Sequence, residues 1–313
     1  MSESNENPAA PWVDPVGLFL SDPESHLSDI LYIYFRHYKK RLVFDLLREA
    51  LRAVENRPDP IVVADVGASM GFDLLYVTRR LRMAGNSILL SRLHLLFLEG
   101  DPRLRAEGET MWASAAKKEF PFEFREAFLT EPLPVKHGSV DFAICSEVVE
   151  HMEQPAELLN SIFAILKPGG CLVLTTDNSP SLPQLIRRIP RWLAGSYSRH
   201  YAPVVKETEI EGSFERKGKT TFIYGHISLK STWEWEKIAR QAGFDIARYG
   251  TYQSIRRGGA GCRPGVLAAY FLAGFLNSCL PRSLGRYCGD TTALLLKKPA
   301  GPSETTTQSM GGS

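Results

Sequence analysis

The sequence predicts an α/β fold whose strands lie mostly parallel in one sheet, and three observations support this prediction. Short apolar runs alternate with stretches of helical spacing along most of the chain. The first run, residues 61–66, is apolar except for one acid, as expected of a strand buried on both faces. A glycine turn at 67–71 follows directly and opens the next helical stretch. Repetition of strand, turn and helix in this order specifies parallel strands joined by crossover helices.

Each further element has its own signal. Apolar residues at helical spacing predict one long helix or two short ones over residues 28–56. Asp101 and Pro102 are placed as the N-cap and first residue of a helix, and Ser231 with Glu234 gives a capping box at the start of another. The other expected elements are helices at 72–84 and 155–166, and strands at 93–99, 122–128, 140–145, 171–176, 244–249 and 291–297.

The turn after the first strand is typical of a nucleotide-type site. Gly67 and Gly71 allow the backbone to approach a ligand where the next helix begins. Asp65 stands at the strand tip, where a carboxylate repels a pyrophosphate and favours a cationic group. The glycines are four residues apart, with Ala68, Ser69 and Met70 between them, which differs from the G-x-G-x-x-G spacing of dinucleotide sites. S-adenosylmethionine, which carries a sulfonium and an ammonium, therefore fits better than NAD.

Four segments between residues 60 and 178 resemble class I S-adenosylmethionine-dependent methyltransferases, in particular the ubiquinone-biosynthesis-type small-molecule branch. They read VADVGASMG, LHLLFLEGDP, GSVDFAICSEVVEHMEQP and LKPGGCLVLTTDN. The resemblance implies a Rossmann-like methyltransferase fold with a seven-stranded, mostly parallel sheet and an antiparallel last strand. Ser69 stands where the family has its middle glycine, and serine adopts a positive φ only at a cost. This departure is the one feature that supports a non-catalytic, cofactor-binding scaffold.

The resemblance also implies which residues bind the cofactor. Glu99 ends the second strand, where an acid can accept both ribose hydroxyls, although Asp101 is a nearby alternative. Glu126 resembles the family's acid at the adenine edge, and the long separation of Glu99 from Gly71 predicts an insertion between them. The complete expected cofactor set is Asp65, Gly67, Ala68, Gly71, Glu99, Glu126 and Ser146.

Two histidines are expected to be catalytic. Methyl transfer to a hydroxyl is an in-line displacement in which a base removes a proton, contributing about 10²- to 10⁴-fold. His151 ends the segment SEVVEH after the fourth strand, and His226 lies in YGHISLKS before the capped helix. The alternative for His151 is a backbone hydrogen bond that fixes its loop, and for His226 a contact at the helix N-terminus. His200, in a long irregular stretch, is a weaker candidate.

A metal-dependent alternative arises from a second resemblance. Glu147, Glu150, His151 and His226 are similar to the residues that hold a divalent metal in small-RNA 3′-end 2′-O-methyltransferases. The same Glu-x-x-Glu-His string is widespread in metal-free small-molecule methyltransferases. The formal net charge of +2 also gives no basic excess for a polyanion. We therefore expect no metal and no nucleic-acid partner, with a metal-dependent RNA 2′-O-methyltransferase as the alternative.

The expected acceptor is a small molecule or a lipid- or sugar-linked group, methylated on oxygen. Five cysteines without metal or disulfide spacing, and no N-terminal signal peptide, predict a cytoplasmic protein. The apolar run 265–280 is shorter than the roughly 20 residues of a transmembrane helix, so peripheral membrane contact is the most that it could provide. The expected organisation is a disordered or extended segment 1–27, a helical cap 28–56, a methyltransferase domain 57–298 with a lid insertion 179–225 and an apolar helical insertion 262–288, and a disordered tail 299–313.

Overall fold

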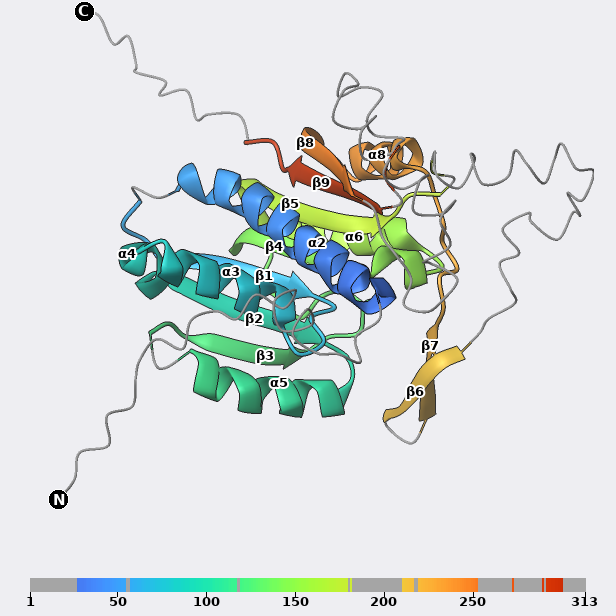
Figure 1. Cartoon of the computed structure of the whole chain (residues 1–313), viewed down its shortest axis with the longest axis horizontal. Coiled ribbons are helices and arrows are strands. Elements are labelled where there is room, and N and C mark those ends of the chain that lie inside the picture. Colours follow the sequence, from blue (N-terminus) through green and yellow to red (C-terminus); the bar gives the residue numbers. More distant parts are fainter. Residues whose placement is uncertain are drawn as a thin grey trace, which may run out of the picture.

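The computed structural model of the chain describes residues 27–54, 57–116, 119–179, 181, 210–216, 219–252, 272, 289 and 291–300 (Figure 1). For residues 27–38, 210–216, 219–224, 251 and 252 the description covers the backbone only. Among these residues the helices are α2 (Leu27–Arg52), α3 (Phe72–Met83), α4 (Ser87–Ser91), α5 (Pro102–Ala115), α6 (Pro155–Ile165) and α8 (Thr232–Gln241), with a 3-10 helix η1 (Val149–His151). The strands are β1 (Ile61–Val66), β2 (Leu93–Glu99), β3 (Phe122–Glu126), β4 (Val140–Ser146), β5 (Leu166–Asp177), β6 (Ile210–Arg216), β7 (Lys219–Tyr224), β8 (Asp245–Tyr252) and β9 (Thr291–Lys297).

Seven strands form one sheet in the order β3-β2-β1-β4-β5-β9-β8. β1 pairs in parallel with β2 and β4, and the parallel pairing continues to β3 on one side and β5 on the other. β9 is antiparallel to both of its neighbours. The expected α/β class, the Rossmann-like sheet and its antiparallel last strand are therefore confirmed. Since β1 and β4 are central, their carboxyl ends lie side by side, where such sheets bind ligands.

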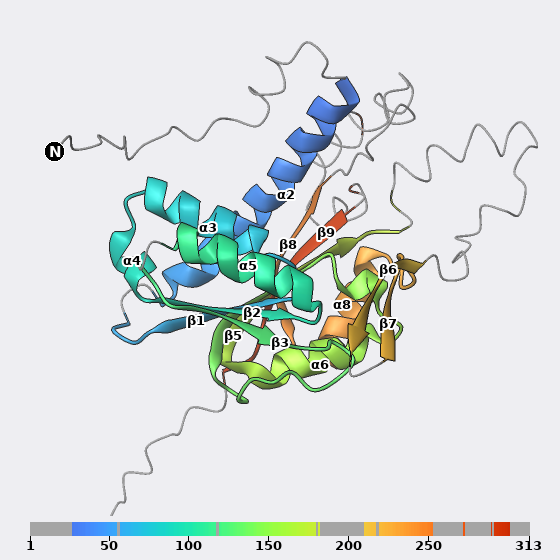
Figure 2. The same cartoon turned by 90° about the horizontal axis from the view of Figure 1, so that it is seen from below.

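The sheet is covered on both faces, as Figure 2 shows in side view. One face packs against α2, α3 and α5, with Leu47, Leu74 and Trp112 in the core beneath them. The other packs against α6 and α8, with Leu158 and Trp235 fully buried. Burial on both faces explains why β1, β2 and β4 are nearly continuous apolar runs.

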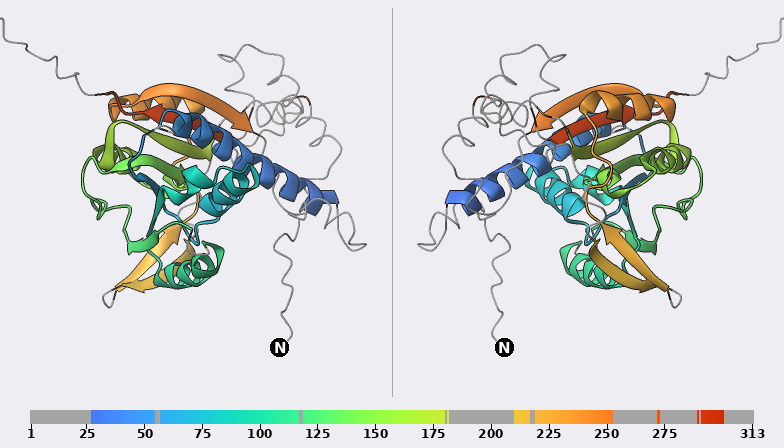
Figure 3. Two further views of the ribbon diagram at one scale, coloured as in Figure 1. Left: turned by 90° about the vertical axis from the view of Figure 1, so that its left-hand side faces the viewer. Right: turned by 90° about the vertical axis from the view of Figure 1, so that its right-hand side faces the viewer.

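Several boundaries differ from the sequence-based expectation. β5 begins at Leu166 instead of 171, because Leu166 pairs with Val140 and the ladder passes the glycine turn with a shift of register. Helix α4 fills the expected insertion between β1 and β2. Part of the expected lid is regular: β6 and β7 form an antiparallel hairpin that stands apart from the seven-stranded sheet (Figures 1 and 3).

Some sequence predictions fall on residues that the structure does not describe. The remainder of the lid, with His200, and the apolar insertion 262–288, apart from Leu272, lie outside the described residues, as do 1–26 and 301–313. Within the part that is described, none of the helices combines the length and apolar character that a bilayer span requires.

Candidate functional site

The glycine turn joins the carboxyl end of β1 to α3 and lies close to two neighbouring elements. Gly67 has φ of +73°, and a Cβ added there would come within 2.6 Å of Val148, just after β4. Gly71 has φ of +79°, and a Cβ there would come within 2.5 Å of Phe97 in β2. Both the left-handed backbone and the lack of space require glycine at these positions. The turn is therefore held tightly at the centre of the carboxyl edge.

Ser69 adopts the conformation for which the family uses glycine. Its φ is +51°, a left-handed value that costs a serine some free energy. Its backbone N–H donates to the Glu99 carboxylate at 2.7 Å, and the other oxygen of Glu99 accepts from the Asp101 N–H at 2.8 Å. Glu99 thus ties the end of β2 to the turn after β1. Asp101 is committed elsewhere, because it caps α5 and pairs with Arg103.

Beneath the turn lies a group of acids that the sequence analysis recognised only in part. Asp65 is 3% exposed, and burial, followed by the nearby Asp73 carboxylate, raises its pKa well above the ordinary value. Asp73, the second residue of α3, was not predicted. Burial raises the pKa of Asp73, but Lys40, then Lys39, and a hydrogen bond from Ser146 together lower it below its ordinary value. The ends of β1 and α3 therefore form an acidic lining to which α2 contributes two cations.

The other expected cofactor residues lie along the same edge. The Ser146 hydroxyl, at the end of β4, is 2.9 Å from the Thr175 hydroxyl in β5. Ala68 is buried, and its N–H donates to the carbonyl of Leu98. Glu126 is paired with Glu99 in the β2–β3 register and lies 3.3 Å from Arg105. The structure thus brings the complete predicted set to the carboxyl ends of β1 to β4.

The two predicted catalytic histidines meet across a loop. The rings of His151 and His226 have centroids 4.8 Å apart and are nearly perpendicular. His226 Nδ1 lies 2.6 Å from Oδ2 of Asp177, the last residue of β5. Sequence reasoning missed Asp177, although an acid directly after the apolar run of the fifth strand is the signal that could have identified it. An aspartate on Nδ1 fixes the ring and leaves Nε2 as its other polar atom.

Glu150 lies between these groups and is fully buried. Oε2 accepts from the Thr176 hydroxyl at 2.9 Å, whereas Oε1 has no hydrogen-bond partner among the described residues. Burial, and then the Glu147 carboxylate, raise the pKa of Glu150 to about 8. One ligand atom each from Glu150, His151 and His226 lie within 4.8 Å of one another.

Backbone hydrogen bonds hold the His226 loop against η1. The carbonyl oxygen of Glu150 accepts from the N–H groups of Ile227 and Ser228 at 2.9 and 2.8 Å. The capping box of Ser231 and Glu234 is present and starts α8 where the sequence predicts. These contacts between η1 and the loop before α8 therefore hold His151 and His226 next to each other.

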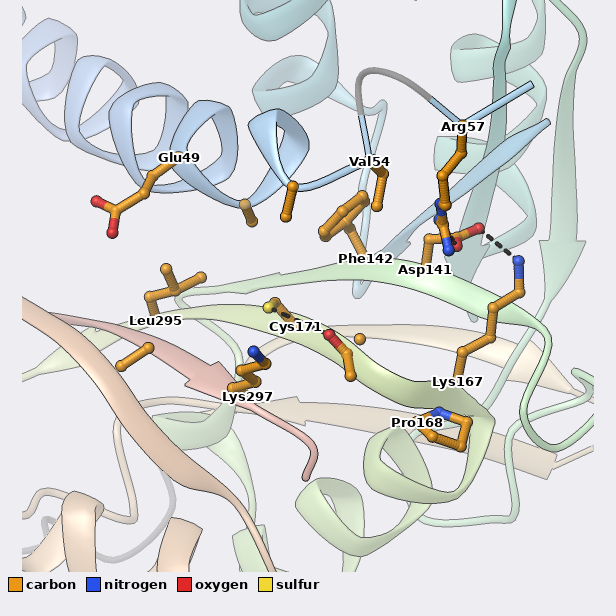
Figure 4. A pocket seen from close by; sticks show the side chains of 15 residues that line it. Glu49, Val54, Arg57, Asp141, Phe142, Lys167, Pro168, Cys171, Leu295 and Lys297 are labelled. Carbon is orange, nitrogen blue, oxygen red and sulfur yellow. Dashed lines mark hydrogen bonds and ion pairs between the residues drawn. The ribbon is translucent and has the colours of Figure 1, made fainter. Parts of the chain in front are cut away.

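A cavity lies at the opposite, amino-terminal edge of the sheet (Figure 4). It is a cavity of about 210 Å³ between the end of α2 and the starts of β4 and β5. Asp141, 3% exposed, accepts from Arg57 Nη2 at 2.6 Å, Lys167 Nζ at 2.8 Å and the Val62 N–H at 3.0 Å. This carboxylate joins three segments, and the length of β4 separates it from the histidines, so we assign it a structural role.

Comparison with known proteins fits this geometry. The model of a family described as methyltransferase domain matches residues 35–249, well over half of the 313 residues. The chain belongs to this methyltransferase family. A methyltransferase domain agrees with the S-adenosylmethionine site that the sequence predicts.

Individual relatives are more distant. An uncharacterized methyltransferase of Mycobacterium sp. strain KMS is 30% identical over 123 residues, 39% of this chain and 41% of the relative. The mitochondrial ubiquinone biosynthesis O-methyltransferase of Dictyostelium discoideum is 27% identical over 105 residues, 30% of this chain and 31% of the relative. The chain thus matches less than half the length of either protein. A crystal structure of an S-adenosylmethionine-dependent methyltransferase from Aquifex aeolicus has a TM-score of 0.43 and 12% identity, covering 80% of this chain and 88% of that one.

Proposed function

We propose that this enzyme transfers the methyl group of S-adenosylmethionine to an oxygen of a small-molecule or lipid- or sugar-linked acceptor, with His226 as the general base. The observation that carries the proposal is the 2.6 Å contact between His226 and Asp177 at the carboxyl edge of the sheet. The ubiquinone biosynthesis O-methyltransferase activity of the Dictyostelium relative agrees with an oxygen acceptor.

The residues present fit the cofactor. Asp73 offers a carboxylate to a cationic ligand, and a cation bound beside Asp65 would oppose the burial that raises the pKa of Asp65. The glycine turn brings backbone close to where the ligand would lie. Glu99 would accept from the ribose hydroxyls, and Glu126 would border the adenine. When bound, the cofactor supplies a methyl group on a positively charged sulfur, which is already activated for displacement.

The chain's own residues then handle the proton. Asp177 holds His226 Nδ1 and stabilises the imidazolium that forms when Nε2 takes the acceptor's hydroxyl proton. His151 packs edge-on against that ring and restricts its orientation. Proximity and alignment supply the larger part of the acceleration, and the base about 10²- to 10⁴-fold.

The test is a methyl-transfer assay with isotope-labelled S-adenosylmethionine and cell extract, followed by mass spectrometry of the labelled product. His226→Ala should lower turnover on the order of 10²-fold or more while cofactor affinity stays unchanged. His151→Ala should lower turnover less, and His137→Ala, which removes an exposed histidine, should have no effect. A His226→Ala enzyme with full turnover would overturn the proposed base, and a label found on nitrogen or carbon would overturn the oxygen acceptor.

A second candidate function is methylation of a ribose 2′-hydroxyl of RNA with a divalent metal bound by Glu150, His151 and His226. The specific observation in its favour is that their ligand atoms cluster within 4.8 Å around a buried carboxylate oxygen that lacks a partner among the described residues. Asp177 would orient His226 from behind, an arrangement common at metal-binding histidines.

Chelation separates the two candidates. The metal-dependent enzyme loses activity in EDTA and regains it with Mn²⁺ or Mg²⁺, and Glu150→Gln removes the response to metal. The metal-free enzyme is indifferent to EDTA. Failure to bind short single-stranded RNA would eliminate the second candidate.

A further inference from the structure

Helix α2 brings two lysines to the acidic edge of the cofactor site. Lys40 Nζ lies 3.3 Å from Asp73 Oδ1, and Lys39 Nζ lies 3.5 Å from Glu147 Oε1. Their side chains are only 24% and 18% exposed. Charges that are largely withdrawn from water interact more strongly with one another than they do in bulk water. The acids come from α3 and from the loop after β4, so one turn of α2 spans both sides of the site.

The amino acid end of S-adenosylmethionine is a zwitterion, with an α-ammonium and an α-carboxylate. Asp73 and Glu147, the acids paired with these lysines, suit the ammonium but would repel the carboxylate. Lys39 and Lys40 stand among these acids and supply the opposite charge. A lysine ammonium has three donors, so it can bind a ligand carboxylate without leaving its protein partner.

We infer that Lys39 and Lys40 bind the α-carboxylate of the methyl donor and are specificity-determining residues for its amino acid end. This inference rests on the proposed function. It assigns to α2 a direct part in cofactor recognition, in addition to covering one face of the sheet.

The setting of α2 supports this role. Near its C-terminal end, Glu49 pairs with Arg248 of β8 at 2.9 Å, which fixes the helix against the sheet. At the other end of the described side chains, the Lys40 ammonium lies 5.5 Å from the centre of the Phe72 ring, at the start of α3. The lysines are thus placed by packing on both sides, which lowers the entropic cost of holding them for a ligand.

The experiment compares ligands that carry or lack the carboxylate. Isothermal titration calorimetry measures binding of S-adenosylhomocysteine, decarboxylated S-adenosylmethionine and 5′-methylthioadenosine to the full chain. The variants are Lys39→Gln, Lys40→Gln and the double substitution. Arg41→Gln is the matched control, because Arg41 lies on the same helix but is 64% exposed and pairs with Asp45. Thermal unfolding of each variant checks that it is folded.

The double variant should bind S-adenosylhomocysteine about tenfold more weakly, equivalent to about 1.4 kcal/mol. Its affinity for decarboxylated S-adenosylmethionine and for 5′-methylthioadenosine should change less than twofold. Lys→Arg substitutions should restore much of the loss, and Arg41→Gln should bind all ligands as the wild type does.

Two results would overturn the inference in distinguishable ways. If the lysine variants lose affinity equally for all three ligands, or for none, the lysines merely neutralise the acids and the proposed function stands. If the wild-type chain binds neither S-adenosylmethionine nor S-adenosylhomocysteine, both the inference and the proposed function fail.

Discussion

Two buried carboxylates, Asp141 at the start of β4 and Glu150 just beyond its end, show how differently the two edges of one sheet are built. Asp141 has partners at 2.6, 2.8 and 3.0 Å, including two cations. Glu150 has a threonine hydroxyl on one oxygen and no partner among the described residues on the other, with an acid and two histidines nearby. Non-glycine left-handed backbone also occurs at the carboxyl edge, at Ser69 and Glu147.

The difference in pairing distinguishes an acid that stabilises the fold, Asp141, from an acid that can still interact with a ligand, Glu150. A buried carboxylate that is fully paired holds segments together, whereas one with an open oxygen costs stability, and such costs are characteristic of functional sites. The cavity at the Asp141 edge is real, but its main charged group is already satisfied. Among the described residues, the histidine edge keeps one carboxylate oxygen without a hydrogen-bond partner, Oε1 of Glu150, and for this reason we locate the chemistry there.

The largest expected effect is that of Asp177→Asn on turnover. Without the carboxylate, His226 loses its orientation and the stabilisation of its imidazolium, so turnover should fall on the order of 10²-fold, or about 2.7 kcal/mol. Steady-state kinetics measure this loss, and calorimetry should show unchanged cofactor affinity. Asp245→Asn, at an exposed position of β8, is the control. Normal turnover in Asp177→Asn would place His226 in a structural role.

Asp141→Asn should affect stability instead of activity. The change weakens contacts to Arg57 and Lys167, which are partly exposed, so we expect a loss of about 1–3 kcal/mol in the free energy of unfolding. Urea denaturation measures it, with the exposed Asp59→Asn as control. If Asp141→Asn were as stable as the wild type but inactive, Asp141 would have a functional role and our assignment of the chemistry to the carboxyl edge would be wrong.

Glu99→Gln should weaken cofactor binding about tenfold, or about 1.4 kcal/mol, through altered hydrogen bonds to the ribose and to the N–H groups of Ser69 and Asp101. Calorimetry with S-adenosylhomocysteine provides the measurement, with exposed Glu107→Gln as the control. Unchanged affinity would mean that a group other than Glu99 accepts the hydrogen bonds of the ribose hydroxyls.

The last prediction concerns the pH dependence of stability. The pKa of Glu150 is about 8 in the folded protein, and its ordinary value is 4.5. Between pH 4.5 and pH 8 the folded protein therefore keeps a proton on Glu150 that the unfolded chain has released. Stability from this group is therefore complete below about pH 4.5 and falls as the pH rises towards 8. In EDTA, Glu150→Gln should flatten this decline, raising the melting temperature by a few degrees at pH 8 relative to the wild type. Glu153→Gln, which alters an exposed acid, should leave the decline intact, and an equally steep decline in Glu150→Gln would contradict the prediction.

Much of the fold could be predicted because local signals agree with the global arrangement. The apolar runs of β1, β2 and β4 indicate strands buried on both faces, and the Ser231 capping box starts α8 as expected. The hairpin of β6 and β7 was not predicted, because its segment has no clear apolar alternation and a polar turn at its centre. The early start of β5 was missed because glycines usually interrupt a strand, whereas here the ladder resumes across them.

The site divides in the same way. Asp65, the glycine turn, Glu99 and the two histidines could be proposed from the sequence because each follows a strand or precedes a helix whose signal is local, and their roles stay predictions. The sequence did not point to Asp73, Asp177 or the pair Lys39 and Lys40. Each of these residues is placed at the site by a contact with a residue far away in the chain.

The sequence by itself determined the succession of the seven sheet strands and the glycine turn, and it predicted the class of cofactor, since these depend on periodicity, on backbone freedom and on the acid at a strand tip. Only the tertiary structure decided that His226 contacts Asp177 and that Oε1 of Glu150 lacks a hydrogen-bond partner among the described residues. It also decided that Lys39 and Lys40 of α2 lie beside Glu147 and Asp73. Burial and pairing of charges depend on which distant segments pack together, and no local pattern records that.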